Sequence, residues 1–244
     1  LADLAGGALE AALAIARVRV QEEARYLPED IADTQLAVIA MGKCGARELN
    51  YVSDVDVIYV VSGTGPNMIP IGTRLASLIA QIIDEPSIEP GLWQVDPNLR
   101  PEGKNGALVR TLEAHLAYYQ KWAEDWEFQA LLKARFVAGN PELGSAYESS
   151  IKPLIWSRAN RAAIVENSRN MRKRVLDLIP AEEKDREIKL GRGGLRDVEF
   201  TVQLLQLVHG VADESLRVPD TLSALEALAN AGLIGRSQQE QFAQ

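Results

Sequence analysis

Two aspartates that lie two residues apart are the side chains in this sequence best suited to chemistry. Asp54 and Asp56 open an apolar run, VDVIYVV at 55–61, that is typical of a buried strand. Side chains two apart on a strand share a face, so the carboxylates should lie side by side. Carboxylates this close repel each other unless a cation lies between them, and Mg²⁺ takes oxygen ligands. Asp96, which ends the strand expected at 91–96, can supply the third carboxylate of a nucleotidyl-transfer site. In isolation the pattern also occurs at solvated strand edges.

A glycine-bearing loop lies directly before this pair of carboxylates. Gly42, Lys43 and Gly45 follow the apolar strand expected at 36–42. Glycines allow backbone N–H groups to approach phosphate oxygens, and Ser53 at the end of the loop can cap either a phosphate or a turn. The combination predicts a site for a phosphorylated ligand together with its metal ion.

A second glycine loop lies late in the chain. Arg192 and Arg196 flank Gly193 and Gly194 immediately before an expected helix. A glycine loop at a helix N-terminus is suited to binding an anion such as inorganic phosphate. The alternative is an ordinary helix start with solvated arginines, in which Asp197 stabilises the first turn.

The pattern of residue types along the chain predicts the helices and strands that position these residues. Strands are expected at 36–42, 55–61, 91–96 and 107–111, and helices at 1–27, 71–84, 112–136, 141–155, 157–178, 195–210, 220–231 and from 236 onward. We therefore expect an α+β protein in three parts: an N-terminal helix (1–29), an α/β core (30–111) and a helical domain (112–244).

Composition limits the classes of function. The 244 residues carry 26 Lys and Arg against 34 Asp and Glu, so the net charge is −8, which disfavours binding to nucleic acid or to an anionic membrane. No apolar run approaches the roughly 18 residues of a membrane helix.

One cysteine, Cys44, excludes an intrachain disulfide and fits a cytoplasmic protein. The chain starts without Met and within an expected helix, so we expect a piece of a longer protein.

The segment MGKCGARELNYVSDVDVIYV at 41–60 resembles the nucleotidyltransferase signature of the bifunctional glutamine synthetase adenylyltransferase/adenylyl-removing enzymes. The resemblance continues at 95–106, 126–141 and 188–210, in family order, and covers most of the chain. It implies a DNA polymerase β-type nucleotidyltransferase with a small sheet followed by a helical domain. Family members contain two such halves, of which one adenylylates a tyrosine of glutamine synthetase and the other removes the AMP by phosphorolysis.

The segment KLGRGGLRDVEF at 189–200 is similar to the adenylyl-removing half. The resemblance implies Mg²⁺ as cofactor, phosphate and ADP or ATP as ligands, and adenylylated glutamine synthetase as substrate. It also implies the signalling protein PII as a partner of the full-length enzyme. It assigns the metal to Asp54, Asp56 and Asp96, and nucleotide phosphate to Gly42, Lys43, Gly45 and Ser53. Arg100 follows the third carboxylate and is implied in phosphate contact, whereas Asn98 stands where the family pattern has an arginine, which leaves that position without an assigned role.

Three alternatives remain open from the sequence. The chain could be the adenylylating half, which would use ATP and release pyrophosphate. It could be another polymerase β-type transferase, acting on a tRNA end or a small molecule, although the acidic charge disfavours long nucleic acid. It could also be a non-catalytic nucleotide-binding regulatory module, although such a module has no need of three metal-binding carboxylates.

Overall fold

The computed structural model describes residues 1–86, 90–157, 161–177, 179–180, 182 and 186–243, and only the backbone of 161–163. These residues form two compact units, one of residues 1–123 with 133–152 and the other of residues 124–132 with 153–244. The division into three parts at residues 29 and 111 stays a prediction.

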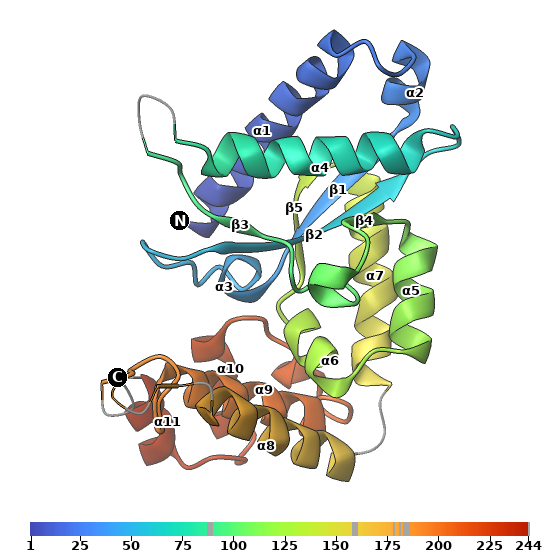
Figure 1. The fold of residues 1–244 in the computed structure, drawn as a ribbon. Helices are drawn as coiled ribbons and strands as arrows, with labels where there is room; N and C mark the ends of the chain where they lie inside the picture. Colours follow the sequence, from blue (N-terminus) through green and yellow to red (C-terminus); the bar gives the residue numbers. More distant parts are fainter. Residues whose placement is uncertain (87–89, 158–160, 178, 181, 183–185, 244) are drawn as a thin grey trace. The chain divides into compact units, whose positions relative to one another are not determined.

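The first unit is built on a five-stranded mixed sheet (Figure 1). Its strands are β1 (Gln35–Ala40), β2 (Val55–Ser62), β3 (Val95–Asp96), β4 (Val109–Arg110) and β5 (Arg135–Gly139). The strand β1 pairs antiparallel with both β2 and β5, while β3 and β4 pair parallel with β2. The central strands are buried almost throughout, as the continuous apolar runs predict, so the sheet is covered on both faces. The α+β class expected from the sequence is confirmed.

Two long helices, α1 (Ala2–Glu22) and α4 (Met68–Asp84), pack on one another and complete the main hydrophobic core with the sheet. The short helix α2 (Pro28–Asp33) connects α1 to β1 and begins at a proline, which has no N–H to leave unpaired there. The outward side of α1 is mixed: Leu4, Ile15 and Val18 are exposed there among charged residues. No helix in the described residues is nevertheless long and apolar enough to cross a membrane.

The remaining elements of the first unit are the one-turn helix α3 (Gly42–Gly45), the 3₁₀ turn η1 (Gly103–Asn105), α5 (Leu112–Lys121) and α7 (Pro141–Trp156) as far as Lys152. The Thr111 hydroxyl caps α5 by accepting from the N–H of Ala114 at 3.2 Å. The helix α5 packs on β2, and the buried His115 places Nε2 at 3.4 Å from the carbonyl oxygen of Tyr59.

The second unit is helical. It contains α6 (Asp125–Leu131), α8 (Arg161–Asp177), α9 (Leu195–His209), η2 (Glu214–Leu216), α10 (Thr221–Asn230) and α11 (Arg236–Ala243). A capping box formed by Glu124 and Glu127 starts α6. A buried hydrogen bond of 2.8 Å joins Gln129 on α6 to Gln203 on α9, and a small apolar core fixes α9 against α10.

The single helix expected at 112–136 is wrong. The structure divides it into α5, α6 and the strand β5. The strand satisfies its backbone groups by pairing with β1, with Arg135 opposite Ala40 and Gly139 opposite Ala37, and this long-range ladder prevails over local helix propensity. The expected strands at 91–96 and 107–111 shorten to β3 and β4, and the helix expected at 1–27 ends at Glu22. The other expected helices are present, although residues 158–160 and 178 of the one expected at 157–178 lie outside the described residues.

Candidate metal centre

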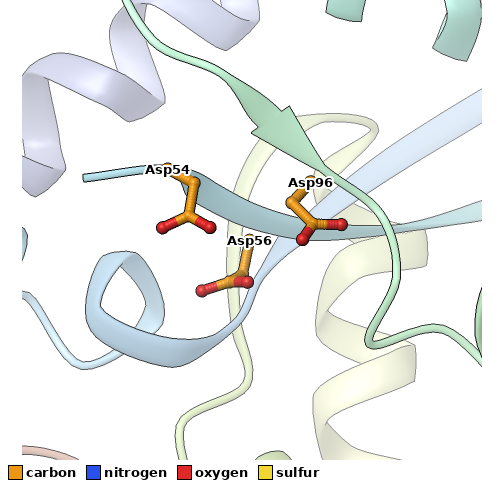
Figure 2. Close-up of side chains that lie close together, drawn as sticks. All are labelled: Asp54, Asp56 and Asp96. Atoms are coloured by element: carbon orange, nitrogen blue, oxygen red, sulfur yellow. The ribbon is translucent and has the colours of Figure 1, made fainter. Parts of the chain in front are cut away.

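Three carboxylates converge at the edge of the sheet where β2 meets β3. Asp54 immediately precedes β2, Asp56 is its second residue, and the parallel register places Asp56 beside Asp96 on β3. One oxygen of each carboxylate lies within 4.8 Å of the others, and the three side chains point toward a common space (Figure 2). The sequence thus correctly predicts that these three side chains lie together.

The local sequence explains why the carboxylates face outward. Val55 and Val57 alternate with the aspartates and are buried in the core beneath the sheet, so the strand turns Asp54 and Asp56 to the opposite side. Asp54 is exposed and the other two carboxylates are half-buried. The backbone N–H of Asn98 donates to Asp96 Oδ1 at 2.7 Å, which orients the third carboxylate.

The chemistry of this donor set fits a hard divalent cation. All three candidate ligands are carboxylate oxygens, which Mg²⁺ and Mn²⁺ prefer, and the spacing allows one ion to contact all three side chains after small rotations. The same spacing concentrates negative charge, which a divalent cation would neutralise.

The turn after β1 lies directly against the middle carboxylate. The N–H of Met41 donates to the carbonyl oxygen of Asp56 at 2.8 Å, and the next residue, Gly42, has a φ of +51°. A Cβ added to Gly42 would lie 2.4 Å from Asp56 Oδ2. The glycine is therefore required twice, by its left-handed backbone and by its closeness to a candidate metal ligand.

The other residues expected to bind nucleotide phosphate have structural contacts of their own. Gly45 is buried, and a side chain there would overlap the carbonyl oxygen of Lys133. Lys43 Nζ donates to the side-chain oxygen of Asn50 at 3.1 Å when the Asn50 amide is turned so that its nitrogen donates to the carbonyl oxygen of Glu48. The Ser53 hydroxyl donates to the carbonyl oxygen of Asp54 at 3.0 Å. A phosphate contact by these residues or by Gly42 stays a prediction.

Arg100 is close to the triad in sequence, and its guanidinium is engaged with its own loop. It is 8% exposed, and it donates from Nη1 to Pro97, from Nη2 to Lys104 and from Nε to Gly106, at 2.9 to 3.1 Å from the three carbonyl oxygens. These bonds give Arg100 a clear role in fixing the loop that follows Asp96. Its contact with phosphate stays a prediction.

Arg192 and Arg196 belong to the second unit, whereas the triad and the loop after β1 belong to the first. Arg192 is exposed, and the Arg196 guanidinium lies 5.4 Å from the centre of the Phe200 ring. The N–H of Gly193 already donates to Asp197 Oδ2 at 2.7 Å, and Arg172 forms an ion pair with the same carboxylate. Burial by itself would raise the pKa of Asp197, but the hydrogen bonds from Arg172 and Gly193 outweigh it and lower the pKa. Phosphate binding by Arg192 and Arg196 stays a prediction.

Sequence reasoning missed two basic residues that contact the loop after β1. Arg135 is the first residue of β5 and Lys133 lies two residues before it, where the sequence predicts the end of a helix. RFVAG at 135–139 shows no apolar–polar alternation, and the helical pattern expected across 112–136 runs into it.

Comparison with known proteins agrees with this geometry. Residues 1–150 match the family described as Glutamate-ammonia ligase adenylyltransferase, and residues 169–244 match the family described as GlnD PII-uridylyltransferase. The chain is 55% identical to proteins named Bifunctional glutamine synthetase adenylyltransferase/adenylyl-removing enzyme from Leifsonia xyli, over 250 residues, and from Streptomyces coelicolor, over 249 residues. It is 52% identical to the protein of the same name from Bifidobacterium longum.

These alignments cover 99% to 100% of this chain but only 23% to 25% of each relative. The chain thus spans about a quarter of the length of the curated relatives it matches. The match over residues 1–150 includes all three aspartates and the loop after β1. The chain therefore belongs to the glutamate-ammonia ligase adenylyltransferase family, which is a family of nucleotidyltransferases.

Proposed function

We propose that this chain belongs to the adenylyl-removing half of an enzyme that regulates glutamine synthetase in the cytoplasm. The observation that carries a nucleotidyl-transfer function is the convergence of Asp54, Asp56 and Asp96 beside a glycine turn. A mixed sheet with one carboxylate just before β2, a second within β2 and a third on its parallel neighbour β3 supports a polymerase β-type core. The choice of the removing half rests on the segment at 189–200, whose glycine loop with Arg192 and Arg196 would take up inorganic phosphate.

In the proposed reaction an oxygen of inorganic phosphate attacks the phosphorus of the adenylyl group on the tyrosine of glutamine synthetase. A new P–O bond forms, the P–O bond to the tyrosine oxygen breaks, and the products are ADP and a phenolate that takes up a proton. No covalent intermediate with the protein is needed. ATP would be the AMP donor of an adenylylating half, which would release pyrophosphate.

The three aspartates would hold Mg²⁺, which neutralises charge on the transferring phosphoryl group when it is bound. Asp56 and Asp96 are held in register by the strand pair, so the chain itself sets the position of two ligands before any ion arrives. Gly42 leaves open the space beside Asp56 that a side chain would fill. Lys43, on the same turn, would place a positive charge near the phosphates. The protein PII would be a partner of the full-length enzyme.

The proposal is tested by phosphorolysis with the full-length polypeptide that contains this chain. The protein is incubated with adenylylated glutamine synthetase, Mg²⁺ and inorganic phosphate, and ADP is followed by chromatography. Asp56→Asn should lower the rate by roughly 10³-fold, because losing one metal ligand costs several kcal/mol of transition-state stabilisation. The matched control is Asp84→Asn, at the exposed end of α4, which should leave the rate unchanged.

The outcomes separate the alternatives. ADP that forms only with phosphate, Mg²⁺ and intact Asp56 supports the adenylyl-removing assignment. Variants that change only the transfer of AMP from ATP to unmodified glutamine synthetase, with release of pyrophosphate, would identify the adenylylating half instead. A folded protein whose output needs no divalent ion would be a nucleotide-binding module.

A further inference from the structure

The short helix α3 has Gly42 at its start, and its other end is in contact with two basic residues, Lys133 just before β5 and Arg135 at the start of β5. We infer that Lys133 and Arg135 are positioning residues for the metal centre: they hold the turn after β1 at a set distance from Asp56. This inference rests on the proposed function, because it assumes that the triad binds a divalent ion.

Arg135 binds the C-terminal end of α3. Its Nε donates to the carbonyl oxygen of Gly45 at 2.9 Å, and its Nη2 donates to the carbonyl oxygen of Cys44 at 3.0 Å. The last carbonyls of a helix have no N–H partner within the helix and can accept from a side chain. The Cys44 carbonyl oxygen also accepts from the N–H of Arg47, at 3.3 Å. The planar guanidinium reaches two neighbouring carbonyls at once, so it fixes orientation as well as distance.

Lys133 fixes the same turn through the backbone and through its side chain. Its carbonyl oxygen lies so close to Gly45 that the position cannot hold a side chain. Its ammonium group, 3% exposed, donates to Glu48 Oε2 at 2.9 Å in the loop that follows α3. An ammonium buried to this degree depends on a charged partner, so the loop is held against the segment just before β5.

The turn transmits this constraint to the metal centre because its other end touches Asp56. Helix α3 has four residues, and a single turn does not hold its own conformation in water. Its position is therefore imposed from outside, by β5 on one side and by β2 on the other. On the β2 side Met41 donates to the Asp56 carbonyl, and Gly42 lies against the Asp56 carboxylate. If the β5 contacts are lost, the turn is free to move away from or onto this carboxylate.

The competing interpretation is that these residues only stabilise the fold. The test is therefore an equilibrium measurement of ion binding, with Mn²⁺ as the probe and electron paramagnetic resonance to count the free ion, together with separate values of kcat and KM. The test variant is Arg135→Gln. Its control is Arg47→Gln. Both guanidinium groups lie near Asp3 Oδ1, with Arg47 Nε at 3.2 Å and Arg135 Nη1 at 3.9 Å. Only the Arg135 side chain also contacts the end of α3.

We expect Arg135→Gln to weaken Mn²⁺ binding at least tenfold and to lower kcat at least tenfold, with KM for the protein substrate changed less than twofold. Arg135→Lys, which restores the charge and one donor, should recover part of the loss. Arg47→Gln should match the wild type. If Arg135→Gln does not fold, the same comparison is made with Arg135→Lys, which should still bind Mn²⁺ more weakly than the wild type.

Wild-type Mn²⁺ affinity and kcat in the folded Arg135 variants would overturn the inference. Equal losses in Arg47→Gln would overturn it too, because the effect would then come from the charge near Asp3. A wild-type protein that binds no Mn²⁺ would instead contradict the proposed function, so the two failures are distinguishable.

Discussion

A methyl group at position 42 would meet the carboxylate at the centre of the triad. In Gly42→Ala the new Cβ would start 2.4 Å from Asp56 Oδ2, whereas real Cβ atoms essentially never approach closer than 3.0 Å. The difference, 3.0 − 2.4, requires a relative movement of at least 0.6 Å between the turn and the carboxylate. Because a misplacement near 1 Å in a reactive geometry can cost about 10²-fold in rate, we expect kcat to fall between roughly 10- and 100-fold.

The substitution also carries a backbone cost that must be separated from the collision. A non-glycine residue at a φ of +51° is destabilised by about 1–2 kcal/mol. Gly232→Ala provides the control, because Gly232 has a φ of +71° but nothing within 4 Å of its added Cβ. Both variants should lose similar free energy of unfolding in urea titrations, and only Gly42→Ala should lose activity and Mn²⁺ affinity. Full activity in Gly42→Ala, or an equal loss in Gly232→Ala, would refute the reasoning.

Two further predictions concern buried titratable groups in the first unit. Burial lowers the pKa of His115 to about 4, opposed by the hydrogen bond to the Tyr59 carbonyl and assisted by the charge of Arg110. The unfolded chain therefore takes up the proton first as the pH falls. The contribution of neutral His115 to the free energy of unfolding is present above about pH 6.5, and about 3 kcal/mol of it is lost as the pH falls to 4. Urea titrations across this range should show the free energy of unfolding falling with pH. His115→Phe should remove this pH dependence. Burial also raises the pKa of the Cys44 thiol, although Arg135 opposes the shift. A thiol reagent should therefore react with the native protein far more slowly than in urea, and equal rates would contradict the described burial of this side chain.

The candidate metal centre was largely predictable because its signals are local. The spacing of Asp54 and Asp56 fixes their common face once β2 is recognised, and the apolar residues around them make that recognition straightforward. Asp96 required one more step, namely that the next strand would return beside the first. The register that makes Asp96 the direct neighbour of Asp56 has no local signature.

The strand β5 was not predictable from its own residues. Its backbone is held by pairing with β1, which lies almost a hundred residues earlier in the chain, across a register shift between Val38 and Ile39. The segment before it is a true helix, α6, so a helical pattern continues almost to Lys133 before the chain changes conformation. The contacts of Arg135 with the carbonyls of Cys44 and Gly45 exist only after this pairing, and no spacing within the sequence encodes them.

The brevity of β3 has a consequence for how steadily the third carboxylate is held. Only Val95 and Asp96 pair with β2, and a single backbone bond of 2.8 Å, from the N–H of Val55 to the carbonyl oxygen of Gln94, supports the approach to the pair. Short segments of this kind belong to the part of a protein that opens locally at low free energy, while the buried strands beside them stay closed. Amide hydrogen exchange should thus be fast at Val95 and Asp96 and slow at Ile58 and Val60. An ion that bridges the strands would slow exchange at β3 alone, which makes the dynamics of this segment a direct report on occupancy of the site.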